Sequence, residues 1–303
     1  MFKHYIWLIV SVLILSSCQQ EPSLQRASDG INARPALWKV SKNGHTMYIF
    51  GSIHILPPEV KWYTSKIQKA YEASEVLIVE SLSETDKDKV MLLQKKYGFL
   101  PQGKVISMYL NDKEYQTYKT IVAQVGMDRY YADRMKPWLF FISLTNRFVY
   151  EVSKYGVDVL MIKEARKMMK KTIALETSKD AIKSLAAIPL KEDIKRLKKF
   201  LNQKPVDKKN NNRKDANNKQ VDMFVAWIIG DTQRLARILR TSMPSKDYYN
   251  IITKRNNKWY PKIKSYIKRY KTAFLTVGTG HLVGKNSIIK RLKRDGYKVD
   301  RIQ

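Results

Sequence analysis

Two of the four histidines in the chain stand in the same short pattern, Gly-x-x-His. The first is Gly51-Ser52-Ile53-His54 and the second is Gly278-Thr279-Gly280-His281, near opposite ends of the chain. Each follows an apolar run that predicts a strand. The turn glycines Gly51, Gly278 and Gly280 let the backbone adopt a positive φ or pass close to a ligand, and ligands bind at the carboxyl ends of strands in open α/β sheets. We therefore expect His54 and His281 to meet in one crevice.

A glutamate ends each of two further strand-like runs. Glu80 closes the unbroken apolar run 76–79, which is typical of a strand buried on both faces, and Glu176 follows the run 172–175. A carboxylate at such a place either caps the next helix or binds a ligand, and one glutamate alone does not decide between these interpretations. The recurrence of reactive side chains at four predicted strand ends is more informative than any one of them.

The elements that must position these side chains predict an α/β fold. Residues 37–50 read as a β-hairpin with an Asn43-Gly44 turn, and residues 273–302 read as a strand, a helix and a strand. Residues 86–170 between them are helical almost throughout, and Asp158 is expected to cap one of these helices. We expect a central β-sheet flanked by helices, with a large helical insertion between the N- and C-terminal segments that form the sheet.

The domain limits follow from composition. Residues 18–35 mix Gln, Ser, Pro, Arg and Gly and predict a flexible tether, so the α/β domain is expected to span residues 36–303. Residues 202–220 are rich in Asn and Lys and almost without apolar side chains, which predicts a mobile loop that cannot repay the entropy of ordering. Helical periodicity resumes at Val221.

Length and charge narrow the class of protein. The 303 residues, 44% of them hydrophobic, can bury a sizeable core. The net charge of +30 could indicate nucleic acid, but the lysines are spread over nearly all predicted helices instead of forming one basic arm. We interpret them as solvated helix faces, with attraction to anionic lipid or polysaccharide as a side effect, and expect no nucleic-acid partner.

The first residues read as an export signal. A short basic start and an apolar stretch lead to Leu15-Ser16-Ser17-Cys18, which resembles the bacterial lipoprotein box. Residues 1–17 are then a signal peptide, and Cys18, the only cysteine, is the lipidation site that anchors the protein to a membrane of the cell envelope. Gln19 favours the outer membrane where the cell has one. The alternative is a buried structural cysteine.

These motifs together resemble the bacterial TraB/PrgY/GumN family, which is related to the Tiki peptidases of animals and more distantly to the erythromycin-esterase and ChaN-like proteins. The resemblance extends from about residue 38 to residue 302. In such proteins the paired histidines, a glutamate and an arginine are thought to form the site, which implies His54, His281, Glu80 and Arg255 here. The motifs that carry the resemblance are Leu37-Trp38-Lys39-Val40, Phe50 to His54, Glu80, Lys136-Pro137-Trp138, Gly156-Val157-Asp158, Leu175-Glu176-Thr177, Arg255-Asn256 with Trp259, and Val277 to Gly284.

The chemistry implied by this set is hydrolysis of a peptide or small ester. Two imidazoles and a carboxylate are ligands of catalytic divalent metals, so His54, His281 and Glu80, with Glu176 as a possible addition, are expected to bind Mn, Co or Zn. Such an ion would activate water, and Arg255 would hold a substrate carboxylate or the developing oxyanion. A metal-free version keeps Glu80 as general base and the histidines as acid-base or orienting groups.

A binding protein without catalysis is the second hypothesis. The ChaN-like relatives suggest that the same crevice could capture haem or a peptide signal instead of cleaving a substrate. Visible absorbance after incubation with haem would favour binding, whereas metal-dependent cleavage of peptides would favour the enzyme.

Overall fold

The computed structural model describes residues 30–82, 87–153, 155–202 and 214–303. They form two compact units, of which the smaller contains residues 98–151 and 189–202, and the larger contains the rest. No helix within these ranges combines the length and the apolar content needed to cross a bilayer. The predicted signal peptide and Cys18 lie outside the described residues.

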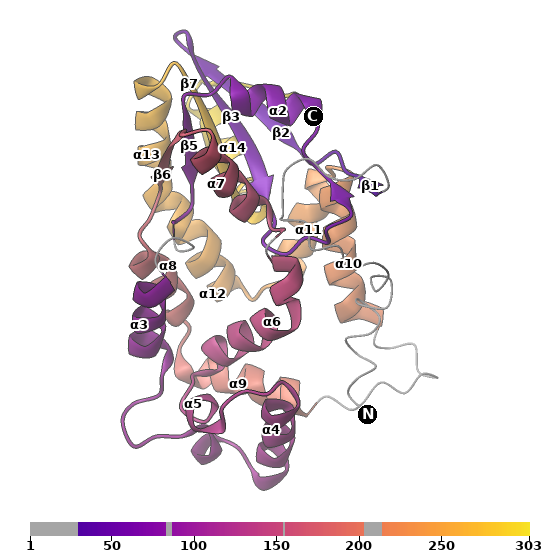
Figure 1. Cartoon of the computed structure of the whole chain (residues 1–303), viewed down its shortest axis with the longest axis vertical. Coiled ribbons are helices and arrows are strands. Elements are labelled where there is room, and N and C mark those ends of the chain that lie inside the picture. Colours follow the sequence, from indigo (N-terminus) through magenta and orange to yellow (C-terminus); the bar gives the residue numbers. More distant parts are fainter. Residues whose placement is uncertain (1–29, 83–86, 154, 203–213) are drawn as a thin grey trace. The chain divides into compact units, whose positions relative to one another are not determined.

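A six-stranded sheet forms the centre of the larger unit, as far as the structure describes it, with strand order β6-β5-β7-β3-β2-β8 (Figure 1). Strands β6, β5, β7 and β3 are parallel, whereas β2 pairs antiparallel with both β3 and β8. The N-terminal and C-terminal segments therefore share one sheet, as the sequence predicted. The strands are β2 (Leu37–Lys42), β3 (His45–Ser52), β5 (Val76–Val79), β6 (Lys171–Ala174), β7 (Thr272–Gly278) and β8 (Lys298–Arg301).

The predicted hairpin between β2 and β3 is present. Asn43 and Gly44 form its turn with φ angles of 51° and 77°. Two consecutive positive φ angles are those of a type I′ turn, whose twist matches the twist of the two strands it joins. The turn thereby sets the register of β3, which carries the first Gly-x-x-His motif.

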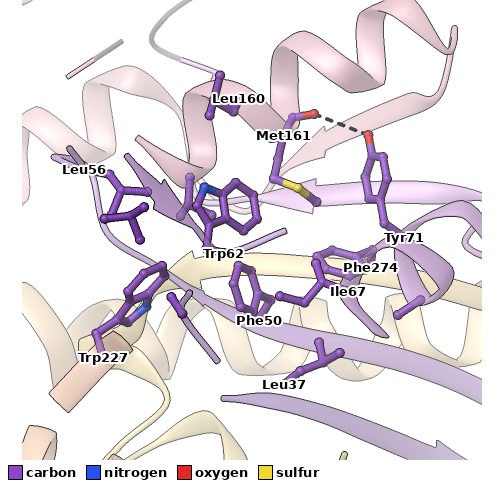
Figure 2. Close-up of a cluster of buried hydrophobic side chains, with 14 of the residues drawn as sticks. Leu37, Phe50, Leu56, Trp62, Ile67, Tyr71, Leu160, Met161, Trp227 and Phe274 are labelled. Carbon is purple, nitrogen blue, oxygen red and sulfur yellow. Dashed lines mark hydrogen bonds between the residues drawn. The ribbon is translucent and has the colours of Figure 1, made fainter. Parts of the chain in front are cut away.

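One face of the sheet is covered by helices on an aromatic core. Phe50, Trp62, Tyr71, Trp227 and Phe274 lie together in it, and the hydroxyl of Tyr71 donates to the carbonyl of Met161 at 3.3 Å (Figure 2). Burial of these large side chains fixes the helices against the strands because each removes a large apolar area from water. The helices are α2 (Ser65–Glu72), α7 (Val157–Lys167), α10 (Lys214–Ile228) and α11 (Thr232–Ser242).

The other face is covered by α13 (Lys254–Arg269) and α14 (Ile288–Arg294). Trp259, Ile263 and Ile267 are spaced four residues apart on α13, which places all three on the buried side of the helix. Residues 245–269 are helical throughout, because α12 (Ser245–Tyr248) and a π-helix (Tyr249–Thr253) directly precede α13. A π-helical turn of this kind often marks a functional site.

The remaining elements of the larger unit are short or peripheral. A capping box between Thr177 and Asp180 begins α8 directly after Glu176. These elements are α8 (Ser178–Ala186), α3 (Lys87–Gly98), which reaches into the smaller unit, the 3₁₀ turn Thr279–His281, and the two-stranded parallel pair β1 (Ile31–Asn32) and β4 (Val60–Lys61).

The smaller unit is helical. Tyr118, Phe140 and Leu197 are buried in its core. Asn111 is a helix N-cap and forms a capping box with Glu114. The elements are the 3₁₀ helix Ile106–Tyr109, α4 (Asp112–Gln124), α5 (Arg129–Ala132), α6 (Pro137–Ser153), whose end belongs to the larger unit, and α9 (Leu190–Leu201).

Part of the predicted loop 202–220 is helical. Residues 203–213 lie outside the described residues, but α10 begins at Lys214, seven residues before the apolar periodicity resumes at Val221. Helix formation is cooperative, so a segment anchored by the buried Trp227 extends into a neighbouring polar stretch at little cost. Hydrophobic periodicity alone therefore placed the start of α10 too late.

Candidate active site

Arg255 lies between two carboxylates in a largely buried cluster. Its Nη2 donates to Glu80 Oε2 and to Glu176 Oε1, each at 2.6 Å, and its Nε donates to Glu176 Oε1 at 3.1 Å. Trp259 Nε1 donates to the other Glu176 oxygen at 3.0 Å, and the Arg255 guanidinium lies 4.4 Å from the Trp259 ring. The two glutamates at predicted strand ends therefore both accept hydrogen bonds from one arginine, and neither is a helix cap.

Strand register brings these side chains together. Val79 pairs with Ala174, and the N–H of Glu176 donates to the carbonyl of Glu80 at 2.9 Å, so the two glutamates follow neighbouring parallel strands and are offset by one residue in register. Arg255 lies in the first turn of α13. Trp259, one turn further along the helix, is buried against the sheet and holds α13 in place. The cluster thus lies at the carboxyl edge of the sheet, where α/β proteins bind ligands.

His281 completes the cluster from the turn after β7. Its side chain is 3% exposed, and its Nε2 lies 3.3 Å from Arg255 Nη1 and 3.6 Å from Glu80 Oε1. Its Nδ1 lies 2.7 Å from Asn256 Oδ1, and its ring centroid is 4.4 Å from that of Trp259. The structure therefore groups His281, Glu80 and Arg255 with Glu176, the predicted additional ligand.

The turn glycines permit close approach and do not supply positive φ angles. None of Gly51, Gly278 and Gly280 has a positive φ. A Cβ at Gly51 would lie 2.8 Å from Thr279 Oγ1, and a Cβ at Gly278 would lie 3.1 Å from Glu80 Oε1. The N–H of Gly278 also donates to Glu80 Oε1 at 2.6 Å. The positive φ that the sequence offered for these glycines is absent, and the close approaches are to protein side chains, so their approach to a ligand stays a prediction.

His54 occupies a different environment. Its side chain is 64% exposed, and its Nδ1 lies 2.7 Å from Asp158 Oδ2. The prediction that Asp158 caps a helix is wrong, because Gly156 is the N-cap of α7 and the Asp158 carboxylate is turned to His54. His54 still acts on the cluster at longer range, since its charge lowers the pKa of both Glu80 and His281.

The environment of the cluster lowers the pKa of both Glu80 and His281. Burial alone would raise the pKa of Glu80, but the charges of His281 and Arg255, with the Gly278 N–H, lower it to about 2. Burial lowers the pKa of His281 to about 4, outweighing the opposing attraction of Glu80. At neutral pH a carboxylate anion therefore faces a neutral imidazole.

The other two members respond differently to burial. Burial raises the pKa of Glu176 against the hydrogen bonds that it accepts from Arg255. Burial also opposes the charge of Arg255, but Glu80 and Glu176 together raise the pKa of the guanidinium. Arg255 is thus a permanent cation held by two carboxylates. Such strongly perturbed neighbouring groups are a common property of active sites.

Two donors of the predicted metal set face each other. The Nε2 of His281 and the Oε1 of Glu80 are nitrogen and oxygen atoms of the kinds that bind zinc or manganese. The charges of Glu80 and Glu176 together exceed that of Arg255, and this negative balance favours binding of a cation. Within the described ranges, no three His, Cys, Asp or Glu side chains are arranged as a metal site. The donor types therefore fit a divalent ion, and the third ligand, His54, stays a prediction.

Three polar residues around the site had no predicted role in it. Asn256, Trp259 and Asp158 hold His281, Glu176 and His54 respectively. All three belong to motifs of the family resemblance, but their spacing along the chain gives no sign of these contacts. Their roles arise because α13 and α7 pack on the sheet.

A cavity of about 790 Å³ lies at the opposite end of the sheet, beside the β2–β3 hairpin. Lys42 and Lys264 line it, but Lys42 donates to the carbonyl of Asp295 and Lys264 pairs with its carboxylate. These contacts neutralise the carbonyl end of α14, so the two lysines have a structural explanation. The strand ends, not this cavity, gather the reactive side chains.

Comparison with known proteins agrees with the motifs. The sequence model of the TraB/PrgY/gumN family matches residues 36–301. The chain is also similar to "Metalloprotease TIKI1" of Xenopus tropicalis, with 23% identity over an alignment 351 residues long. The alignment covers 97% of this chain and 68% of that protein. The family match includes both Gly-x-x-His motifs, both glutamates and Arg255, and it confirms the resemblance. This chain belongs to the TraB/PrgY/gumN family.

Proposed function

We propose that this protein is a hydrolase of peptide or ester bonds whose reaction takes place at the cluster of Glu80, Glu176, Arg255 and His281. One observation carries the proposal: at a sheet edge, a permanent cation lies within hydrogen-bonding distance of a fixed anion and of a neutral imidazole, which are themselves 3.6 Å apart. A similar protein is named a metalloprotease, which supports peptide bonds as the first substrates to test.

Arg255 is the group suited to negative charge in the reaction. Its guanidinium has only N–H donors, and its Nη1 faces His281 rather than a carboxylate. A substrate oxygen that gains negative charge in the transition state could accept from that nitrogen. Glu176 and Trp259 hold the guanidinium in place and thereby preorganise it.

Glu80 is better suited to a fixed negative charge than to proton transfer. A carboxylate whose pKa is lowered to about 2 is a weak base, because efficient general bases titrate near the working pH. This argues against Glu80 as the base of a metal-free reaction. It favours Glu80 as a ligand of a cation, together with the neutral Nε2 of His281.

A divalent ion is part of the proposal. His281 and Glu80 would bind it, with His54 as the third ligand from the loop after β3. The bound ion would polarise the scissile carbonyl and lower the pKa of water. The residues of this chain would supply the remaining effects: Arg255 would orient the substrate, and Asp158 would hold the His54 ring through Nδ1.

The test combines metal content with turnover. The purified chain is assayed on a peptide library and on small esters, with and without added Mn, Co or Zn. His281→Ala and His54→Ala should each lose metal uptake and lower kcat/KM at least a hundredfold. His45→Ala is the matched control, because His45 contacts the Tyr270 carbonyl at the far end of the sheet.

Two results would redirect the proposal. Full turnover in His281→Ala would remove the cluster from the reaction. A chain that cleaves nothing but gains visible absorbance with haem would instead be a binding protein, which is the alternative suggested by the ChaN-like relatives.

We also propose that the protein works in the cell envelope, anchored by acylation of Cys18. The lipoprotein-like tetrapeptide and the absence of any other cysteine in the sequence support this location. Cys18→Ser should move the protein from the membrane fraction to the soluble fraction and abolish incorporation of labelled palmitate. Retention of both in the variant would contradict the lipid anchor.

A further inference from the structure

Asn256 joins three parts of the site through one side chain. It lies in the first turn of α13 and is fully buried. Its Nδ2 donates to the carbonyl oxygens of His281 and Asn286, at 3.2 and 3.1 Å, and its Oδ1 lies 2.7 Å from His281 Nδ1. A buried side chain with all of its polar atoms engaged has a single favourable orientation.

The two carbonyl oxygens fix the orientation of the Asn256 amide. Both are acceptors, so only the NH₂ end of the amide can face them, and the amide oxygen must face the histidine ring. An amide oxygen accepts and cannot donate. The hydrogen bond at 2.7 Å therefore requires a proton on His281 Nδ1.

The other side of the ring leads independently to the same protonation. Arg255 Nη1 lies 3.3 Å from His281 Nε2, and a guanidinium has donors only. Nε2 must then accept, which it can do only without a proton. One proton on Nδ1 and a lone pair on Nε2 satisfy both contacts.

We propose that Asn256 is the positioning residue that holds His281 as its Nδ1–H tautomer and presents the Nε2 lone pair to the cluster of Glu80 and Arg255. The use of that lone pair by an ion or a substrate rests on the proposed function. The tautomer itself does not, because it follows from hydrogen bonds that exist without either.

The two Gly-x-x-His histidines are held in parallel but unequal ways. Both form a hydrogen bond through Nδ1, His54 with the carboxylate of Asp158 and His281 with the amide oxygen of Asn256. The helices that supply the partners, α7 and α13, pack on opposite faces of the sheet. A neutral amide orients the ring without adding negative charge beside it.

The tautomer can be measured without metal or substrate. The full chain is labelled with ¹³C and ¹⁵N in histidine rings and studied by NMR at neutral pH in the presence of a chelator. The four histidines of the sequence give few signals, and His281→Gln identifies the signal of interest. The expected spectrum has a protonated Nδ1 and an unprotonated Nε2 for His281. A proton on Nε2 in the unmodified chain would overturn the proposal.

Variants of Asn256 test whether this residue selects the tautomer. Asn256→Ala removes the acceptor, so the Nε2–H form should become populated by donation toward Glu80. Asn256→Asp keeps an acceptor for Nδ1–H but loses the N–H groups that face the two carbonyl oxygens, so a proton should stay on Nδ1 in this variant. Asn257→Ala is the matched control, since Asn257 is an exposed neighbour whose Oδ1 accepts from Arg291. An unchanged tautomer in folded Asn256→Ala would refute the assignment.

Metal affinity gives a second measurement. Loss of a group that orients a metal ligand typically weakens affinity about 10–100-fold, so Asn256→Ala should weaken Zn binding by this factor and Asn256→Asp by less. If neither the variants nor the unmodified chain bind metal, the proposed metal-dependent function fails while the tautomer result stands. If Asn256→Ala does not fold, the spectrum of the unmodified chain still decides.

Discussion

Glu80 and Glu176 accept hydrogen bonds from the same nitrogen, Nη2 of Arg255, each at 2.6 Å. The two carboxylates follow the ends of adjacent parallel strands and would repel each other without a cation between them. The guanidinium therefore has a structural role in addition to the chemical role proposed for it. It allows the two glutamates at the strand ends to be buried as anions, and it directs its Nη1 toward His281.

The first prediction concerns the removal of this cation. Arg255→Met should lower the free energy of unfolding by roughly 3–5 kcal/mol, because it leaves two carboxylates facing each other in a buried site. Urea denaturation at neutral pH measures the loss. Adding Glu176→Gln to Arg255→Met should recover part of it. Equal stability of Arg255→Met and the unmodified chain would show that the cluster is solvated.

The second prediction concerns pH. The pKa of His281 falls from 6.5 in the unfolded chain to about 4 in the folded one, so below pH 6.5 the unfolded chain binds a proton that the folded chain does not. Stability must therefore fall as the pH falls from 6.5 toward 4, by about 2 kcal/mol at pH 5 from this residue. The fall in stability between pH 7 and pH 5 should be smaller in His281→Gln than in the unmodified chain, and unchanged in His45→Gln. Identical pH profiles for all three proteins would contradict burial of a neutral imidazole.

The third prediction concerns the contact between the two Gly-x-x-His turns. Gly51→Ala should cost about 1–3 kcal/mol by overpacking, because its Cβ would lie 2.8 Å from Thr279 Oγ1. Thermal unfolding measures the loss, and Thr279→Ala in the same chain should relieve part of it. If Gly51→Ala alone is as stable as the parent, the two turns are not in the tight contact described.

The fourth prediction concerns metal removal. Dialysis against a chelator should abolish hydrolysis, and addition of Mn, Co or Zn should restore it, because the proposed reaction needs the ion to activate water. Glu80→Gln should keep the fold but bind the ion at least tenfold more weakly, since an amide replaces an anionic ligand. Activity that survives exhaustive chelation would leave only the metal-free use of the cluster.

Much of the fold follows from local patterns. The apolar run 76–79 predicts a strand buried on both faces, and Asn43-Gly44 predicts the hairpin turn, because side-chain alternation and turn geometry are decided within a few residues. The recurrence of histidine or glutamate after four strands indicates the edge at which the site lies. The start of α10 and the π-helix before Arg255 were not predictable in this way, since packing of distant segments determines them.

The sequence by itself determined the reactive side chains, their places at strand ends and the family of the protein. Tertiary structure decided which of those side chains are buried together and which partner each one has. His281 is buried against Glu80 and Arg255 with an amide on its Nδ1, whereas His54 is exposed and paired with a carboxylate. Identical local motifs cannot encode this difference. The partners come from α13 and α7, more than twenty residues away from His281 and more than a hundred from His54, and only packing of those helices on opposite faces of the sheet brings them to the rings.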